Sequence, residues 1–372
     1  MSRRRGMVFV MVLVGGGLIG LRGSAAEPAA GVAADIARLA AAAPGDDQLA
    51  LAAAADRLAT VAADRIRAPL AALGNATPAG SNWLRSGLDR AAERLGDGLK
   101  LDLLAELVAD KELTPRGRSL AFGWLEARAP DRAASLLAGM LDEEALDLRR
   151  AAVAKLLADA AAGDAAAQLA AHRQALEAAR DVDQVEAIAT WLTEHGAPTD
   201  VAETLGFVRR WLVSDAYDNA GGGGFAQAYP PEQGEAAPGM AAADWKPVVS
   251  SHNHGEIDLN AAVATKKGVL AYAHAEVEMP AAGPAEVRIG SPCAVVVWVN
   301  GRQVMAHEIY HASEAIDQYV AVAEFRQGAN FVLVKCCQNE QTEPWAGEWK
   351  FQLRITDPLG KPLATQRTGE PK

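Results

Sequence analysis

Apolar residues follow two different periods along the chain, and the change lies between Thr204 and Phe207. Before it they recur at helical spacing, in segments rich in Ala and Leu, which are good helix formers. After it, short alternating segments are bounded by Gly, Pro and Asn, which is typical of antiparallel strands. The pattern predicts an all-α part over residues 27–205, an antiparallel β-sandwich of the jelly-roll type over residues 206–360, and a disordered tail over residues 361–372.

Proline, glycine and capping residues divide the first part into helices. A Pro followed by Gly stops a helix, whereas Thr before Pro starts one, because the missing N–H of proline costs nothing in the first turn. The signals are a break at Pro44-Gly45 with a cap at Asp46 or Asp47, a break from Asn75 with a cap at Ser81 or Asn82, a start at Thr114-Pro115, a restart at Pro130, and a last helix from Val182 to His195.

Two runs in this part carry a repeat-like pattern. The run from Leu148 to Leu157 resembles the second helix of a HEAT repeat, and the run from Arg118 to Leu125 is a looser copy. The resemblance implies a small solenoid in which each helical hairpin buries its apolar face on the next. Because two copies are fewer than the roughly three that usually make a stable array, an irregular helical bundle stays open as the alternative.

Short alternating segments in the second part predict its strands. Asn300-Gly301 separates two of them, and Asn-Gly suits the positive φ values of a two-residue type I′ hairpin. The expected strands are Arg210–Ser214, Lys246–Val249, Gly268–Val277, Ala285–Ser291, Ala294–Val299, Gln303–His307, Tyr319–Phe325, Asn330–Gln338 and Trp349–Thr356.

The second part also resembles a known domain family. The runs from Cys293 to Val304 and from Phe325 to Lys335 are similar to the galactose-binding-like jelly roll, which is the sugar-binding domain of family 2 glycoside hydrolases. The run from Trp211 to Glu232 resembles the opening of this jelly roll in exported bacterial proteins, where it follows HEAT-like helices. The resemblance implies a jelly-roll fold and a binding role, but a fold alone does not specify a sugar ligand.

Aromatic and amide side chains of this part are the candidate ligand contacts, because rings stack on the apolar side of a pyranose and amides bond its hydroxyl groups. Trp345 and Trp349 are favoured because Pro344 and Gly347 indicate a loop. For each aromatic residue, packing in the core or at its rim is the alternative. The main candidates are Trp245, Trp298, Tyr310, Gln338, Asn339, Trp345 and Trp349, and Glu340 and Gln341 beside Asn339 offer further polar groups.

Two metal sites have to be weighed. Residues 307–311 spell His-Glu-x-x-His, which binds zinc when a helix brings the two His one turn apart. Val304 and Met305 are strand-like instead, so a helix over residues 305–313 is needed to support a zinc-dependent hydrolase, and strand and loop would exclude it. The second candidate is a structural calcium site at Asp215, Asp218 and Asn219, with a plain glycine-rich turn as the alternative.

The first 26 residues resemble an export signal. Arg3, Arg4 and Arg5 precede an apolar run from Met7 to Leu21 and a small-residue site at Ser24 to Ala26. A retained membrane anchor is the alternative, but the run is shorter than the roughly 20 residues that span a bilayer. We expect a periplasmic or secreted protein that does not bind membranes after signal cleavage.

The net charge excludes one class of partner, and the cysteine positions limit which disulfide can form. The formal net charge is −11 at pH 7, and after the predicted signal the Arg residues are interleaved with Asp and Glu, so nucleic acid is a poor partner. An exported location permits a disulfide. Adjacent residues on a strand point to opposite faces, so at most one of Cys336 and Cys337 can face Cys293.

Taken together, these observations predict a non-enzymatic exported protein that binds a carbohydrate through its second part, with the helical part as a scaffold. No set of acid, base and nucleophile is evident in the helical part, and no cofactor is expected beyond the calcium candidate. The alternatives are a protein–protein interaction module and, third, the zinc-dependent hydrolase. The sequence leaves the ligand and the oligomeric state open.

Overall fold

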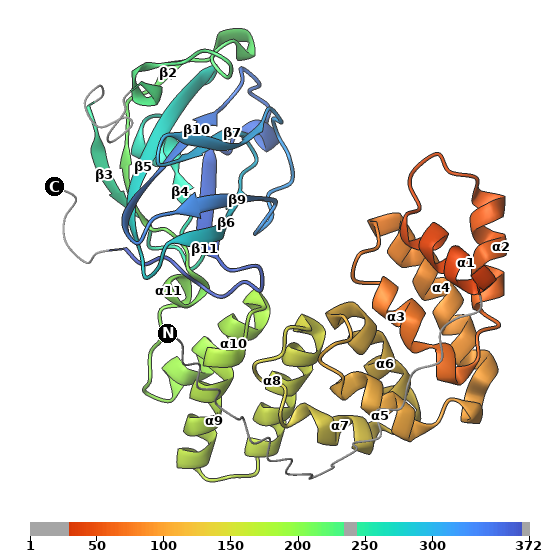
Figure 1. Cartoon of the computed structure of the whole chain (residues 1–372). Helices are drawn as coiled ribbons and strands as arrows, with labels where there is room; N and C mark the ends of the chain where they lie inside the picture. Colours follow the sequence, from red (N-terminus) through yellow and green to blue (C-terminus); the bar gives the residue numbers. More distant parts are fainter. Residues whose placement is uncertain (1–29, 234–243, 367–372) are drawn as a thin grey trace, which may run out of the picture. The chain divides into compact units, whose positions relative to one another are not determined.

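The computed structural model describes residues 30–233 and 244–366 of the 372-residue chain. Helices lie mainly in the N-terminal part and antiparallel sheets in the C-terminal part (Figure 1). The predicted export signal lies outside the described residues, as do residues 367–372 of the predicted tail. None of the helices in the described ranges is long and apolar enough to cross a membrane.

The helices follow one another with short connections. They are α1 (Ala30–Ala40), α2 (Gln48–Leu58), α3 (Arg67–Ala72), α4 (Pro78–Leu95), α5 (Leu101–Ala109), α6 (Pro115–Arg128), α7 (Pro130–Leu137), α8 (Leu146–Ala160), α9 (Ala165–Ala178), α10 (Val182–Glu194) and α11 (Val201–Leu205), with a short α12 (Leu259–Ala262) among the strands. The chain divides into two compact units, one ending at Ala129 and the other beginning at Pro130. The second unit therefore contains α7 to α11 together with all the strands, and helix gives way to strand after Gly206, which caps α11 with φ 79°.

Most predicted helix boundaries are confirmed. Asp47 caps α2 by accepting the N–H groups of Leu49 and Ala50, and Thr114 caps α6, where Pro115 is the first helical residue. The predicted cap of the next helix at Ser81 or Asn82 is wrong. Helix α4 begins four residues earlier, because Thr77 accepts the N–H of Gly80 and Pro78 fits the first turn as Pro115 does.

The first unit uses the sequence Thr-Pro-x-Gly twice, at residues 77–80 and 114–117. In each case the threonine caps a helix and the glycine lies against an earlier carbonyl. A Cβ atom built on Gly80 would lie 2.3 Å from the carbonyl oxygen of Ala40, and one on Gly117 would lie 2.6 Å from that of Leu70. The absence of a side chain at both glycines therefore allows the close approach of α4 to α1 and of α6 to α3.

Antiparallel strands form two sheets in the second unit. The seven-stranded sheet has the order β3-β1-β5-β10-β7-β8 with β2 paired to β5, and the four-stranded sheet has the order β4-β11-β6-β9. The strands are β1 (Arg210–Val213), β2 (Tyr217–Asp218), β3 (Lys246–Val249), β4 (Ile257–Asp258), β5 (Val269–Met279), β6 (Gly283–Gly290), β7 (Ala294–Val299), β8 (Arg302–His307), β9 (Tyr319–Phe325), β10 (Gly328–Cys337) and β11 (Lys350–Thr356).

The nine predicted strands are all found, within one or two residues at their ends. The predicted hairpin is also confirmed, since Asn300 and Gly301 join β7 to β8 with φ values of 50° and 81°. Strands β2 and β4 were not predicted, because two residues are too few to show an alternating pattern.

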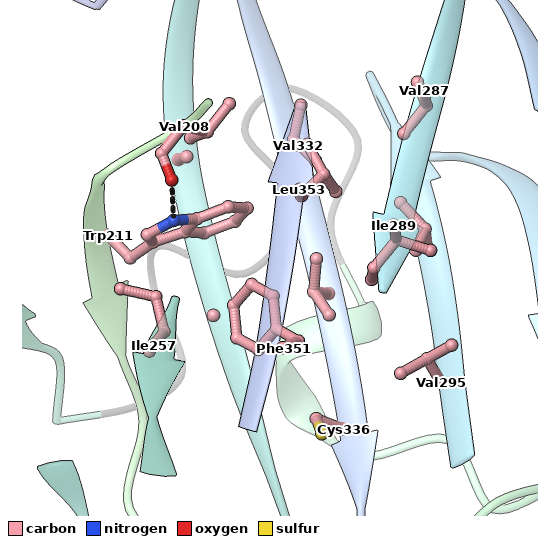
Figure 2. Packing of buried hydrophobic residues seen from close by; sticks show 14 of the residues in the cluster. Val208, Trp211, Ile257, Val287, Ile289, Val295, Val332, Cys336, Phe351 and Leu353 are labelled. Atoms are coloured by element: carbon pink, nitrogen blue, oxygen red, sulfur yellow. Dashed lines mark hydrogen bonds between the residues drawn. The ribbon is translucent and has the colours of Figure 1, made fainter. Parts of the chain in front are cut away.

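Both sheets contribute to a single buried cluster, which we call the shared core. It contains residues of β5, β7 and β10 from the larger sheet and of β6, β9 and β11 from the smaller one. Trp211 meets Phe351 edge to face, with ring centroids 5.1 Å apart, and its indole N–H donates to the carbonyl of Val208 at 2.8 Å (Figure 2). The indole is therefore buried with its one polar group satisfied.

A second apolar group lies on the other face of the seven-stranded sheet, and we call it the outer cluster. It consists of Leu270, Tyr272, Ala294, Leu333 and Cys337. Cys293 and Cys336 belong to the shared core, so only one of the vicinal cysteines shares a face with Cys293, as predicted, and all three are free thiols.

Lys335 holds the segment before residue 234 against this face. Its buried ammonium donates to the carbonyls of Phe225 and Gln227 at 2.9 and 2.8 Å and pairs with Glu232 at 2.8 Å. A buried lysine needs such partners, because an unpaired charge would cost several kcal/mol.

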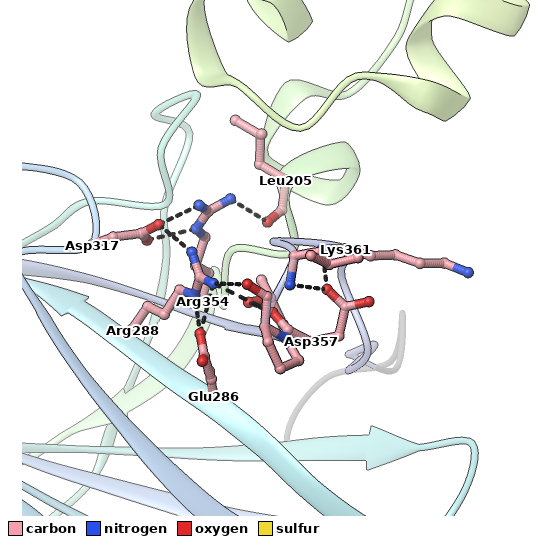
Figure 3. Close-up of polar contacts among 10 residues, drawn as sticks. Leu205, Glu286, Arg288, Asp317, Arg354, Asp357 and Lys361 are labelled. Carbon is pink, nitrogen blue, oxygen red and sulfur yellow. Dashed lines mark hydrogen bonds and ion pairs between the residues drawn. The ribbon is translucent and has the colours of Figure 1, made fainter. Parts of the chain in front are cut away.

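Buried charges join the end of α11 to the β strands (Figure 3). Arg354, which is 3% exposed, pairs with Asp317 and donates to the carbonyl oxygen of Leu205 at 3.3 Å. Arg288 pairs with the same carboxylate at 2.7 Å and with Glu286 at 2.6 Å. Burial alone would raise the pKa of Asp317, but the bonds from Arg354 and Arg288 outweigh it, and the net pKa lies below its usual value.

Residues 361–366, predicted as part of a disordered tail, are instead bonded to the β strands. Pro362 and Thr365 form isolated bridges to Thr356 and Glu278. The side chain of Gln366 accepts the N–H groups of Arg209 and Arg210. These partners lie far away in the sequence, so local composition could not reveal them.

The two glycines of α6 should respond oppositely to alanine. Gly117→Ala should lower the free energy of unfolding by about 1–3 kcal/mol, because the new methyl group meets the Leu70 carbonyl. Gly123→Ala should raise it by about 0.5–1 kcal/mol, since Gly123 is exposed with nothing near its Cβ position and alanine favours the helix. Urea unfolding followed by circular dichroism measures both, and equal effects would contradict the close approach at Gly117.

Removing the Asp317 carboxylate should destabilise the second unit in a pH-dependent way. We expect Asp317→Asn to cost about 3 kcal/mol at pH 7, because it removes the carboxylate that pairs with the buried Arg354 and one of the two that pair with Arg288. The folded-state pKa of Asp317 is lowered, so its contribution is present above the unfolded-state pKa of about 4 and is lost as pH falls further. The difference from wild type should therefore shrink in urea titrations at low pH. Glu324→Gln, at an exposed position of β9, is the control and should have little effect.

Candidate ligand-binding surface

Three loops meet at one end of the β strands. They are the β8–β9 loop, the β10–β11 loop and the turn that follows β2. The side-chain amide of Asn219 donates to the Tyr310 hydroxyl at 3.2 Å, and the N–H of Gly221 donates to the Glu340 carboxylate. His311 bonds Asn339 at 2.8 Å. The three loops therefore form one continuous surface, and we call Tyr310, His311, Asn339, Gln341 and Trp345 the loop surface.

Trp345 is the most exposed aromatic residue of the loop surface. It lies in a short 3-10 helix, Pro344–Ala346, and its side chain is 61% exposed. The His311 ring meets the indole edge to face, with centroids 5.1 Å apart and an interplanar angle of 89°. An exposed indole beside a polar ring provides a flat apolar face for a ligand to stack on.

Asn339 organises the polar groups beside the indole. Its Oδ1 accepts the N–H of Gln341 at 3.1 Å and a hydrogen bond from His311 Nε2 at 2.8 Å, so Nε2 carries a proton. Its Nδ2 donates to Gln341 Oε1 at 3.0 Å. The position of each group is thus fixed by the others before any ligand arrives.

His311 has a φ of 58°, a left-handed conformation that non-glycine residues seldom adopt. Its bond to Asn339 and its contact with Trp345 hold it in place. Backbone strain of this kind is frequent at binding sites, where the surrounding structure imposes it.

Tyr310 lies at the rim of the loop surface and also packs against the outer cluster. Burial raises the pKa of its phenol, so the hydroxyl stays protonated at neutral pH. A Cβ atom built on Gly222 would lie 3.8 Å from this hydroxyl and 3.9 Å from the Glu308 carboxylate. The glycine-rich turn thus lies beside the phenol and the carboxylate.

The seven residues predicted as ligand contacts fall into three groups. Trp345, Tyr310 and Asn339 come together in the loop surface. Trp349 and Gln338 are buried, and the indole of Trp349, at 0% exposure, donates to the carbonyl of Cys336 at 3.1 Å. Trp245 and Trp298 are partly buried and pack against the outer cluster. We therefore leave these four residues out of the candidate site.

His311 belongs to the candidate site but was not predicted as a ligand contact. The sequence marked it only as a possible zinc ligand, because it closes the His-Glu-x-x-His motif. Its hydrogen bond joins it to Asn339, 28 residues further along the chain, so the local sequence could not show this contact.

The His-Glu-x-x-His sequence does not adopt the geometry that zinc catalysis requires. His307 is the last residue of β8 and stacks on Tyr319 at 3.9 Å, whereas His311 lies in a loop and bonds Asn339. Without a helix the two imidazoles do not share a face one turn apart. Within residues 30–233 and 244–366, no three His, Cys, Asp or Glu side chains are grouped so as to hold a metal ion.

The three residues of the calcium candidate each bond to a different partner. Asp215 pairs with Lys246 at 2.6 Å, and Asp218 accepts the N–H of Ala220 at 3.2 Å. The Asn219 amide donates to Tyr310 and to the carbonyl of Gln338. These side chains stabilise different parts of the turn, so they do not fit a single set of calcium ligands.

Comparison with known proteins does not identify a family for this chain. No family model and no curated protein matches the chain. A solved structure similar to part of it is a GH31 alpha-xylosidase from Xanthomonas citri, with 7% sequence identity and a TM-score of 0.20. The match covers 40% of this chain and 16% of that chain. We draw no conclusion about fold or function from a likeness this weak.

Two tryptophans four residues apart should differ sharply in their effect on stability. Trp349→Ala should cost about 3–5 kcal/mol, because it leaves a cavity in the shared core. Trp345→Ala should change the free energy of unfolding by no more than about 0.5 kcal/mol, since its side chain is mostly in solvent. Chemical unfolding of the two variants beside wild type checks this, and a large loss at Trp345 would mean that this indole is structural.

Proposed function

We propose that the chain is a non-enzymatic binding protein and that its loop surface recognises a carbohydrate. The observation that carries this proposal is the exposed indole of Trp345 beside the mutually bonded His311, Asn339 and Gln341. Sugars present an apolar face of C–H groups and a rim of hydroxyl groups. The indole suits the first, and the imidazole and the amides suit the second.

Preorganisation supports the same proposal. Binding is weakened by the entropy lost when flexible side chains become fixed, about 0.5–1.5 kcal/mol for each one. His311, Asn339 and Gln341 already restrain one another through hydrogen bonds, so less of that cost remains when a ligand binds.

We also propose that the two sheets form a β-sandwich of the galactose-binding-like type. The support is that both sheets are antiparallel and contribute side chains to one shared core. The runs around Cys293–Val304 and Phe325–Lys335 resemble that family in sequence. In such a sandwich the loops between the sheets are the natural place for a ligand.

The helices are proposed to form HEAT-like repeats that serve as a scaffold. In support, hydrogen bonds join side chains at nearly constant sequence separations, as stacked repeats require. Trp124 donates to Asp89 at a separation of 35 residues, Arg90 to Asp56 at 34, and Arg150 to Asp183 at 33. The repeated Thr-Pro-x-Gly capping sequence agrees with such a period.

Export to the periplasm or the medium remains part of the proposal and rests on the sequence alone. The basic, apolar and small-residue segments of residues 1–26 support it. The net charge of −11 agrees with ligands other than nucleic acid.

A protein partner is the second candidate, and exposed apolar residues of the same region favour it. Val320 and Val322 lie on one face of the edge strand β9, at 48% and 65% exposure, and Ile309 lies in the adjoining loop at 48%. Contiguous exposed apolar groups are typical of protein interfaces.

Binding of the purified chain to a broad glycan panel tests the first candidate. We expect at least one saccharide to bind, and Trp345→Ala to weaken its affinity about tenfold, because stacking on the indole is lost. Asn339→Ala should also weaken it. Val322→Ser is the control, an exposed change outside the loop surface that should leave saccharide affinity unchanged.

The same variants separate the two candidates. If no saccharide binds, or if Trp345→Ala leaves every interaction intact, the carbohydrate proposal is wrong. If instead a defined protein partner binds and Val322→Ser weakens it while Trp345→Ala does not, β9 is the recognition surface.

A further inference from the structure

An open pocket of about 520 Å³ lies within the second unit, away from the loop surface. Its walls come from the α7–α8 connection, from α8 and α9, from the α9–α10 connection, and from the turn that follows β11. Leu141, Arg149, Ala178, Arg180 and Asp357 are among the lining residues. Pockets of a few hundred Å³ that combine apolar walls with a few charged groups are typical of small-ligand sites.

Two arginines bring positive charge to this pocket, and their hydrogen bonds to backbone carbonyls do not neutralise it. Arg149 is 7% exposed, and its Nε donates to the backbone carbonyl of Glu143 at 2.6 Å. Arg180 donates to the backbone carbonyls of Glu177 and Ala179 at 2.8 and 2.6 Å, and its buried Nε has no partner among the residues that the structure describes. Backbone carbonyls satisfy donors but carry no net charge.

The two guanidinium groups also repel each other. Burial lowers the pKa of Arg180, and the charge of Arg149 lowers it further. Asp357 counteracts this only in part, because its charge is the smallest of the three effects on Arg180. Its Oδ1 is held in the turn by the N–H groups of Leu359 and Lys361 at 2.9 and 2.8 Å (Figure 3). Asp142 and Glu177, the other acidic lining residues, are exposed to solvent, where their charges are screened.

We propose that this pocket binds a small ligand through an oxyanion, a carboxylate or a phosphate, whose negative charge lies between Arg149 and Arg180. An anion there relieves the repulsion between the two guanidinium groups and accepts charge-assisted hydrogen bonds from them. Leu141 and Ala178 provide apolar contact for the rest of the ligand. The site is separate from the proposed carbohydrate surface and does not depend on it.

Thermal unfolding and calorimetric titration of the full chain with inorganic phosphate and with citrate test the proposal, against sodium chloride at equal ionic strength. We expect at least one of the two anions to raise the melting temperature beyond the chloride effect. Arg180→Gln should weaken its binding by about tenfold or more, the worth of a charged hydrogen bond. Arg173→Gln is the matched control, because Arg173 is exposed on the same region of the chain, in α9.

A second variant keeps the test decisive. If Arg180→Gln does not fold, Arg180→Lys keeps the charge but loses the planar fork, and should still weaken the anion effect. The proposal is wrong if phosphate and citrate act no more strongly than chloride, or if they act equally on wild type and the Arg180 variants. Binding of phosphate alone or citrate alone identifies which oxyanion the pocket selects.

Discussion

Burial of one apolar cluster by two sheets is the constraint on which the β strands and their loops depend. Trp211, Phe351 and their neighbours fill the shared core only if β5, β7 and β10 keep their register and β6, β9 and β11 keep theirs. That requirement fixes where each strand ends. The β8–β9 and β10–β11 connections both pass from the larger sheet to the smaller one. They leave from the same end, because β8 and β10 both pair antiparallel with β7 and so run in the same direction. The loop surface is therefore a consequence of the core, and its polar network needs to organise only the last few residues.

Buried charged side chains hold the end of α11 against the β strands. Arg354 lies on β11, and two of its contacts reach outside the sheet, one to Asp317 and one to the carbonyl of Leu205 at the end of α11. Breaking such a network leaves unpaired charges in a dry environment, which is far more costly than losing an exposed ion pair. The turn at residues 357–361 follows directly on β11, so the same contacts place Asp357 opposite the arginines of α8 and of the α9–α10 connection. The contacts between α11 and β11 therefore help to determine the shape of the pocket.

The sequence predicted what local pattern controls and missed what depends on distant partners. Short apolar or alternating segments bounded by Gly, Pro and Asn located nine strands, because those three residues mark where a strand ends. It could not separate Trp345 from Trp349, since Pro344 and Gly347 suggest a loop for both. Trp349 directly precedes β11, and its N–H donates to the carbonyl of Cys336 in the interior. Trp345 lies in a short 3-10 helix, and its side chain is exposed to solvent. Likewise Arg149 and Arg180 had no distinguishing neighbours in the sequence, because the pocket joins segments as far apart as Ala138 and Lys361.

The two proposed sites differ in how they meet the acidic surface of the chain. A neutral sugar is neither attracted nor repelled by a net charge of −11. Its affinity for the loop surface therefore depends on shape, stacking and hydrogen bonds alone. An anion approaching the pocket is repelled at long range, and its affinity must come from the two guanidinium groups within a few ångströms. Salt screens the distant repulsion more than the partly buried attraction, because Debye screening acts mainly on exposed charges about 8–10 Å or more apart. Moderate salt should therefore favour entry of the anion at first, and it should weaken binding only where the salt anion itself competes for Arg149 and Arg180.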